Sequence, residues 1–116
     1  MILLPIVLIG FMGAGKTSIG ALLAEHYGYE FVDIDACIVD QCSMSISDVF
    51  AKHGESYFRD VEGSVFASVL GQNASMVIAT GGGVVDQVKN QQLLQQQPWV
   101  VWLDVSFDTV LLRVGG

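Results

Sequence analysis

Basic residues are scarce in this 116-residue chain, which has five lysines and arginines against twelve aspartates and glutamates. The formal net charge of −7 argues against a nucleic-acid-binding surface, because such surfaces gather cations to neutralise phosphates. Any anionic ligand must therefore be held by one or more of a small set of side chains. The five cations are Lys16, Lys52, Arg59, Lys89 and Arg113.

Cysteine is rarer still, since Cys37 and Cys42 are the only two in the chain. Two thiols at this spacing are too few for a zinc ligand set or for a disulfide framework. We therefore expect both thiols to be reduced, as is usual in the cytoplasm, and we expect a cytoplasmic protein.

Long apolar stretches of membrane-spanning length are also missing, so we expect no membrane partner. The segment 1–15 is apolar enough to imitate a signal peptide, but it lacks the positive charges with which such peptides begin. Hydrophobic residues nevertheless make up 52% of the chain. That share suits a parallel sheet buried on both faces, and the length suits one domain over residues 1–116.

The clearest motif is a phosphate-binding loop at 10–17, with the sequence Gly-Phe-Met-Gly-Ala-Gly-Lys-Thr. It matches G-x-x-x-x-G-K-[ST] and lies between an apolar run at 6–9 and a helix-like stretch at 18–25. The glycines allow successive N–H groups to turn inward around one anion, and the following helix points its positive dipole end there. We expect Lys16 to reach the outer phosphates of a nucleotide and the Thr17 hydroxyl to bind Mg²⁺.

Hydrophobic periodicity and turn residues predict strands that alternate with helices along the chain. This alternation is typical of βαβ units with right-handed crossovers, and it predicts an α/β fold with a parallel sheet. The expected strands are 5–9, 31–35, 76–79 and 99–104, and the expected helices are 16–27, 36–42, 46–52, 55–70 and 86–97, with a last helix from Ser106 or Asp108.

Local signals predict three of the helix ends. Ser45 followed by Asp48 resembles a capping box at the start of a short helix. Gly54 is expected to end that helix, and Gly71 is expected to cap the longer helix that follows it.

Several polar or glycine-rich segments follow predicted strands directly. They are the loop at 10–17, the pair Asp33 and Asp35, the glycines at 81–83, and Asp104. Ligands of open parallel sheets bind at the carboxyl ends of the strands, so we expect these segments to converge there.

Asp33 and Asp35 would point to the same face of a strand, about 7 Å apart. One could then serve a metal ion and the other a substrate, and the alternative is a pair of solvated turn carboxylates. Asp104 is a rival metal ligand, because an apolar run that ends in Asp resembles a Walker B segment. We prefer to interpret Asp104 as an ordinary strand-end residue or helix cap.

Arg59 and Glu62 are three residues apart on a predicted helix and are therefore neighbours. They are either a surface ion pair of little energetic value or an arginine fork for a carboxylate, oriented by Glu62. The glycines at 81–83 are either a flexible turn or a place where a ligand approaches the backbone closely, and we favour the second.

Four segments together resemble the shikimate kinase family. They are GFMGAGKTS at 10–18, FVDID at 31–35, FRDVE at 58–62 and TGGG at 80–83. The resemblance extends over nearly the whole chain. It implies a three-layer P-loop kinase fold with a central parallel sheet of strand order 2-3-1-4-5.

The resemblance also implies phosphoryl transfer from ATP to the 3-hydroxyl of shikimate, with Mg²⁺ as the metal ion. This reaction belongs to the chorismate pathway. We expect the protein to be a monomer. On the metal side, Thr17 would hold Mg²⁺ and Asp33 would lie close to it. Asp35 would contact shikimate hydroxyls as the candidate base, and Lys16 and Arg113 would act on the phosphates. The full nucleotide set is Gly13, Ala14, Gly15, Lys16, Thr17, Ser18 and Arg113, and the further substrate set is Arg59, Gly81, Gly82 and Gly83.

The family pattern continues past Gly116 into most of a lid, a fifth strand, an adenine-contacting loop and a final helix. The resemblance therefore implies that residues 1–116 lack these parts. Another small-molecule P-loop kinase, such as a gluconate-type kinase, is an alternative. A nucleotide-binding module without turnover is a second alternative, from a different functional class.

Overall fold

The structure, a computed structural model, describes residues 5–10, 16–72, 74–81, 83–97 and 99–103. Within two of the helical segments and one strand, the description of five residues is limited to the backbone. Those residues are Lys16, Thr17, Val85, Trp102 and Leu103.

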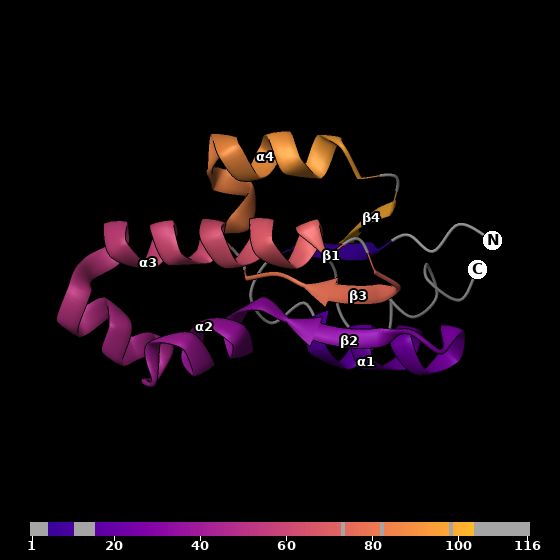
Figure 1. Ribbon diagram of the computed structural model, residues 1–116, viewed down its shortest axis with the longest axis horizontal. Helices are drawn as coiled ribbons and strands as arrows, with labels where there is room; N and C mark the ends of the chain where they lie inside the picture. The colour runs from indigo at the N-terminus through magenta and orange to yellow at the C-terminus, as the bar shows by residue number, and fades with distance from the viewer. Residues whose placement is uncertain (1–4, 11–15, 73, 82, 98, 104–116) are drawn as a thin grey trace.

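A four-stranded parallel sheet lies at the centre (Figure 1). Its spatial order is β2 (Glu30–Asp33), β3 (Met76–Ala79), β1 (Ile6–Gly10) and β4 (Trp99–Leu103). Ile6 pairs with Val77 on one side and with Trp99 on the other, so β1 is an inner strand. The predicted α/β class, the parallel sheet and the order 2-3-1-4 are confirmed for these strands.

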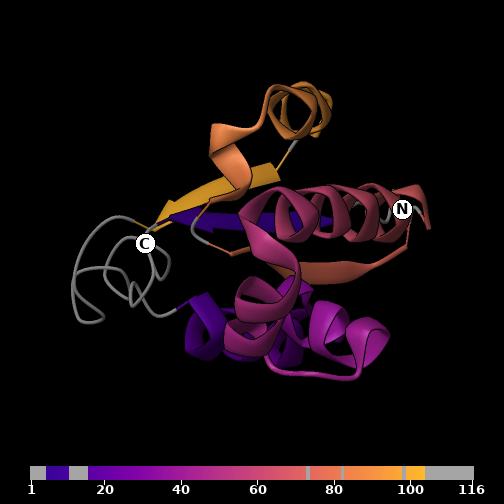
Figure 2. The same ribbon diagram turned by 90° about the vertical axis from the view of Figure 1, so that its left-hand side faces the viewer.

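Helices cover both faces of the sheet, as Figures 1 and 2 show from two directions. Helix α1 (Lys16–Tyr27) lies on one face, with α3 (Ile46–Gly71) and α4 (Val88–Gln95) on the other. Helix α2 (Ile34–Cys42) follows β2 and packs against α3. The predicted bounds of α1 are confirmed.

Alternate residues of the inner strands point to opposite faces, because side chains alternate along a strand. Val7 and Ile78 belong to the larger core beneath α2, α3 and α4, which includes Phe66. Leu8 and Val77 belong to the smaller core beneath α1. Both faces are thus buried, as the high hydrophobic share of the sequence predicted.

The strand predicted at 31–35 was wrong at its end, because β2 stops at Asp33 and Asp35 lies in the first turn of α2. Asp33 Oδ1 accepts hydrogen bonds from the backbone N–H groups of Asp35 at 2.9 Å and Ala36 at 3.3 Å. Asp33 is therefore the N-cap of α2, and the two aspartates do not share a strand face.

The predicted start of α3 is confirmed, since Ser45 Oγ accepts a hydrogen bond from the Asp48 N–H at 3.1 Å. Gly54 interrupts the helix with φ 87° and ψ 171°, a conformation that favours glycine, and the predicted break is confirmed. The cap predicted at Gly71 was wrong. Gly71 is still helical, and the C-cap residue is Gln72 with right-handed angles.

Other predicted bounds need smaller corrections. The first strand begins and ends one residue later than predicted. The helix predicted at 86–97 is a 3₁₀ turn, η1 (Val84–Asp86), followed by α4. Gln87 is extended, with φ −99° and ψ 128°, and separates the two. Asp104 and the helix predicted after it lie outside the described residues.

Gly20 provides a test of the packing between α1 and the sheet. A Cβ atom at this position would overlap Cε1 of Phe31 and lie 3.2 Å from Leu8 Cδ1. Overpacking of this kind costs about 1–3 kcal/mol, whereas alanine gains about 1 kcal/mol over glycine in a helix. We expect Gly20→Ala to lower the free energy of unfolding by up to about 2 kcal/mol in urea denaturation.

Gly71→Ala is the matched control, because no atom lies within 4 Å of the added Cβ. It should raise the free energy of unfolding by about 0.5–1 kcal/mol. Equal stabilities for the two variants would contradict the close approach of α1 to Phe31.

Candidate active site

The chain leaving β3 is fixed to the neighbouring strand by Thr80. Its backbone N–H and its Oγ1 hydroxyl both donate to the carbonyl oxygen of Leu8, at 3.2 and 2.7 Å. Thr80 is buried, so these bonds are shielded from water. Gly81, which follows directly, is thereby held at the carboxyl edge of the sheet.

Arg59 and Glu62 form a largely buried ion pair on the second half of α3. Arg59 Nη1 donates to Glu62 Oε1 at 3.1 Å, and the Glu62 side chain is only 1% exposed. Arg59 also lies 3.7 Å from the exposed Glu55 carboxylate and 5.3 Å from the centre of the Phe58 ring. The burial of Glu62 excludes the interpretation of this pair as a solvated surface contact.

Two glycines pack against this ion pair. A Cβ atom on Gly81 would lie 3.0 Å from Asp35 Oδ1 and 3.1 Å from Glu62 Oε2. A Cβ atom on Gly83 would overlap the guanidinium of Arg59. A side chain at Gly83 would make the Arg59 guanidinium move, and one at Gly81 would push the two carboxylates away by a few tenths of an ångström, so both glycines let these charged groups keep their positions.

These five residues, Asp35, Arg59, Glu62, Gly81 and Gly83, are here named the acceptor cluster. They come from α2, from α3 and from the segment after β3. The structure thus brings together the predicted acceptor residues that it describes. Gly82, the remaining predicted substrate residue, lies outside the described residues.

Several carboxylates surround the single guanidinium of the cluster. Burial raises the pKa of Glu62 above the ordinary carboxyl value, and the negative charges of Asp35 and Asp86 add to the rise. The hydrogen bond and the positive charge of Arg59 lower the same pKa and offset part of the effect. Arg59 therefore stabilises a carboxylate that its surroundings disfavour.

Asp86 was not foreseen in the sequence as a neighbour of this site. Its position as the last residue of η1 follows from a backbone hydrogen bond to the carbonyl of Gly83 at 3.1 Å. The glutamine-rich stretch that follows Asp86 led us to predict a solvated helix that begins at this residue, so the tight turn before it was not predicted. The available signal for the turn was the spacing of three residues between Gly83 and Asp86.

The nucleotide side of the prediction is described only in part. The backbone of Lys16 and Thr17 opens α1, and Ser18 is exposed in its first turn, while the side chains of Lys16 and Thr17 are not described. The predicted residues Gly13, Ala14, Gly15 and Arg113 lie outside the described residues, and so does Asp104.

No group of three or more His, Cys, Asp or Glu side chains that could hold a metal occurs among the described residues. Asp33 nevertheless provides a carboxylate, the oxygen ligand that Mg²⁺ prefers, at the carboxyl end of β2. Its Oδ1 is fixed by the first turn of α2, so its orientation is set. This donor fits a partly hydrated Mg²⁺, which takes few protein ligands.

Two further observations bear on the expectations from composition. Cys37 and Cys42 are both free thiols, and burial raises the pKa of Cys37, assisted by the charges of Asp33 and Asp40. Across the described ranges, no helix has the length and apolar character needed to cross a membrane.

Comparison with known proteins gives one family. A model of the shikimate kinase family matches residues 12–116. A shikimate kinase of Sulfurihydrogenibium sp. (strain YO3AOP1) is 44% identical over 109 residues, which cover 94% of this chain and 65% of the relative. The chain thus spans just under two thirds of that relative's length.

Solved structures point to the same family. A shikimate kinase from Acinetobacter baumannii in complex with shikimate has a TM-score of 0.85 and 39% sequence identity, covering 97% of this chain and 62% of that one. A gluconokinase from Sinorhizobium meliloti 1021 has a TM-score of 0.50 and 18% identity over 99% of this chain and 67% of its own. The second likeness shows a shared fold alone.

The raised pKa of Glu62 predicts a pH dependence of stability. The folded protein keeps the Glu62 proton to higher pH than the unfolded chain, so the parent loses stability as pH rises between the two pKa values. Glu62→Gln cannot titrate there. We expect its free energy of unfolding, relative to the parent, to rise with pH across this interval and then to level off.

Urea denaturation from below the ordinary carboxyl pKa to neutral pH measures this difference. Glu55→Gln is the control, because it removes an exposed carboxylate beside the same guanidinium and should stay within about 0.5 kcal/mol of the parent. A pH-independent difference for Glu62→Gln would show that Glu62 is not desolvated.

Proposed function

Because this chain belongs to the shikimate kinase family, we propose that the protein transfers a phosphoryl group from ATP to the 3-hydroxyl of shikimate. The observation that carries this proposal is the acceptor cluster, in which Arg59 and Asp35 converge on Gly81 and Gly83. The relative from Acinetobacter baumannii was solved with shikimate bound, which supports the same substrate for this protein.

Arg59 is proposed to hold the carboxylate of shikimate. A guanidinium has five N–H donors in a planar fork, so it can donate to Glu62 through Nη1 and still form two parallel bonds to a second carboxylate. The close approach of Gly83 fixes the plane of the fork from one side. Glu62 thus positions Arg59 and does not need to contact the substrate itself.

Asp35 is proposed to accept the proton of the attacking hydroxyl. Its Oδ1 lies against Gly81 and its carboxylate is half-buried beside Glu62, within the reach of a substrate held by Arg59. Its negative charge disfavours a second charge on Glu62, so the two carboxyl groups are close enough to interact. A carboxylate within reach of the attacking hydroxyl is the kind of group that serves as a general base. The backbone of Gly81, Gly82 and Gly83 would border the bound acceptor.

The loop at 10–17 and the start of α1 are proposed to bind ATP. Lys16 would neutralise charge on the outer phosphates, and Arg113 would act on the same group. The donors for the remaining phosphate oxygens are proposed to be Gly13, Ala14, Gly15, Thr17 and Ser18.

Mg²⁺, when bound, would offset negative charge on the phosphates during transfer. We propose that the Thr17 hydroxyl and Asp33 hold it, Asp33 through water. Asp33 is kept in place by its hydrogen bonds to the backbone of Asp35 and Ala36. One short segment therefore orients a residue for the metal and a residue for the acceptor.

The remaining proposals concern the setting of the reaction. The five residues of the acceptor cluster all come from one chain, which is consistent with a monomeric enzyme. Free thiols at Cys37 and Cys42 suit the reducing cytoplasm, where we expect the protein to act. The gluconate-type alternative is not favoured, because that likeness rests on the fold.

Arg59→Lys tests the acceptor assignment. Lysine is a point charge and cannot reproduce the two parallel bonds of the fork, each worth roughly 1.5–3 kcal/mol. We expect kcat/KM for shikimate to fall about ten- to a hundredfold, at roughly 1.4 kcal/mol per decade. ATP affinity without shikimate should barely change. Separate titrations of the two substrates with the protein in its full natural length measure both.

Glu55→Gln is again the matched control, because it removes an exposed partner of Arg59 and leaves the guanidinium intact. Its kcat/KM for shikimate should stay within about threefold of the parent. Loss of ATP binding in Arg59→Lys with normal shikimate use would overturn the assignment of α3 to the acceptor side.

A further inference from the structure

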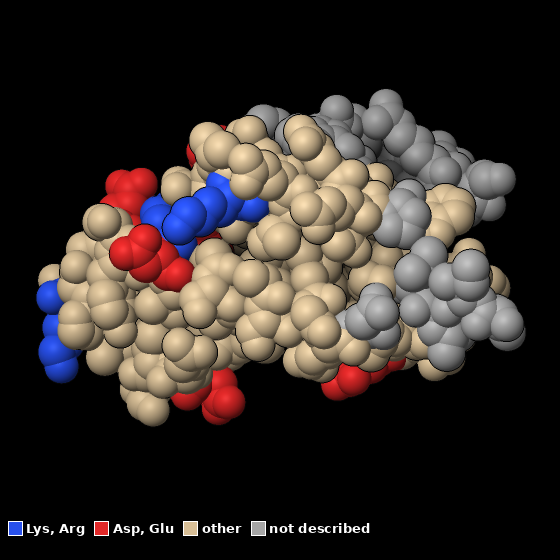
Figure 3. All heavy atoms as spheres, turned by 45° about the horizontal axis from the view of Figure 1, so that its top comes forward, with Lys and Arg blue, Asp and Glu red and all other residues tan. Residues whose placement is uncertain are grey.

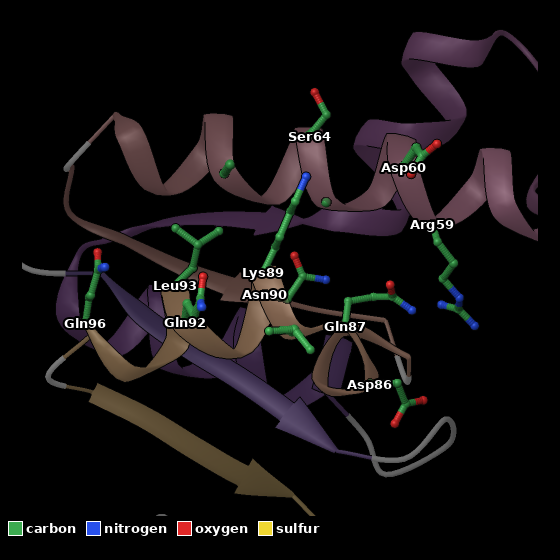
Figure 4. Close-up of a pocket in the computed structure, with 13 residues that line it drawn as sticks. Arg59, Asp60, Ser64, Asp86, Gln87, Lys89, Asn90, Gln92, Leu93 and Gln96 are labelled. Atoms are coloured by element: carbon green, nitrogen blue, oxygen red, sulfur yellow. The ribbon is translucent and has the colours of Figure 1, made fainter.

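A cavity runs between α3 and the segment that contains η1 and α4. We name it the α3–α4 pocket, and its volume is about 880 Å³. Sites for small molecules commonly have this size. Figure 4 shows Arg59 and Asp86 at one end of the pocket, Leu93 and Gln96 at the other, and Lys89 and Asn90 between them.

Asn90 has a buried donor without a partner. Its side chain is only 1% exposed, and its Nδ2 group has no hydrogen-bond acceptor among the described residues. The carbonyl side of the amide faces α3, since a Cβ on Gly63 would lie 3.5 Å from Asn90 Oδ1. An unsatisfied buried donor destabilises the folded protein, so an acceptor from a bound molecule would stabilise it.

Lys89 is the second donor in the same pocket. It extends from α4 toward α3 (Figure 4), and no carboxylate in the described part of the chain lies within 4 Å of its ammonium. Arg59, in contrast, is already paired with Glu62 and Glu55. Figure 3 shows basic side chains gathered on this face, with acidic ones beside them.

The side chains near Lys89 and Asn90 favour an anion over a cation. Asp60 and Asp86 lie toward the Arg59 end (Figure 4). The opposite end is lined by Gln92, Gln96 and Leu93, which carry no charge. A negative group held between Lys89 and Asn90 would meet one ammonium and one amide donor, while the two lining carboxylates lie toward the Arg59 end.

We propose that the α3–α4 pocket binds a small molecule bearing a carboxylate or phosphate group, through the Lys89 ammonium and the Asn90 side-chain amide. Both groups offer N–H donors to the same kind of anionic oxygen, and such charge-assisted bonds are stronger than neutral ones. Arg59 of the acceptor cluster borders one end of this pocket, but neither of the two proposed ligand-binding residues belongs to that cluster.

NMR titration of the protein in its full natural length tests the proposal. Inorganic phosphate and malate are added in separate arms at constant ionic strength, with sodium chloride as the reference salt. We expect a saturable shift of the Asn90 side-chain amide signal in at least one arm, and the responding arm distinguishes phosphate from carboxylate. The signal is assigned by its disappearance in Asn90→Asp.

Lys89→Gln should weaken the apparent affinity roughly tenfold, the loss expected when one charge-assisted bond is removed. Lys52→Gln is the matched control, because Lys52 is an exposed lysine outside the pocket, and its affinity should equal that of the parent. Asn90→Asp should abolish binding. Because this variant lacks the Asn90 side-chain amide, its titration is followed through the shift of the Ser64 backbone amide signal.

Three outcomes would overturn the proposal. The first is an Asn90 signal that neither probe moves, which would mean that water satisfies the amide. The second is an equal shift with sodium chloride alone, which would indicate general screening. The third is unchanged binding in Lys89→Gln, a surface substitution that should leave the fold intact even where Asn90→Asp does not.

Discussion

The ion pair between Arg59 and Glu62 is the interaction on which the rest of the candidate site depends. A carboxylate that is 1% exposed needs a positive partner, and Arg59 provides it at 3.1 Å. The pair in turn requires space, which Gly81 and Gly83 leave by having no side chains. Loss of Arg59 would leave a buried carboxylate without its positive partner, and a side chain at Gly83 would displace the guanidinium.

The topology brings this pair to the substrate edge of the sheet. Strands β2, β3 and β1 are parallel neighbours, so the segments after them meet at one end. The two bonds from Thr80 to Leu8 hold the glycines there, and the Asp33 cap begins α2 so that Asp35 turns toward Gly81. Short-range capping and long-range strand pairing therefore determine the site together.

Much of this arrangement could be predicted from the sequence, because hydrophobic runs mark the buried strands and Ser45 and Gly54 have clear local signals. The end of β2 could not be predicted, because an aspartate such as Asp33 can be either a strand residue or a helix cap. Which of the two it becomes depends on whether the N–H groups that follow turn back toward its carboxylate. The spacing of Arg59 and Glu62 could not predict the burial of Glu62 either, because residues three apart are neighbours on any helix. Whether the pair is solvated depends on how β3 and the glycines after it pack against α3.

Phosphorus NMR of the protein in its full natural length, given ATP and Mg²⁺ with either shikimate or gluconate, tests the central claim most directly. The account predicts a new phosphate monoester on shikimate, formed far faster than any product from gluconate. Preferred transfer to gluconate would contradict the acceptor assignment. Binding of ATP without a phosphorylated product from either acceptor would contradict the proposed kinase activity.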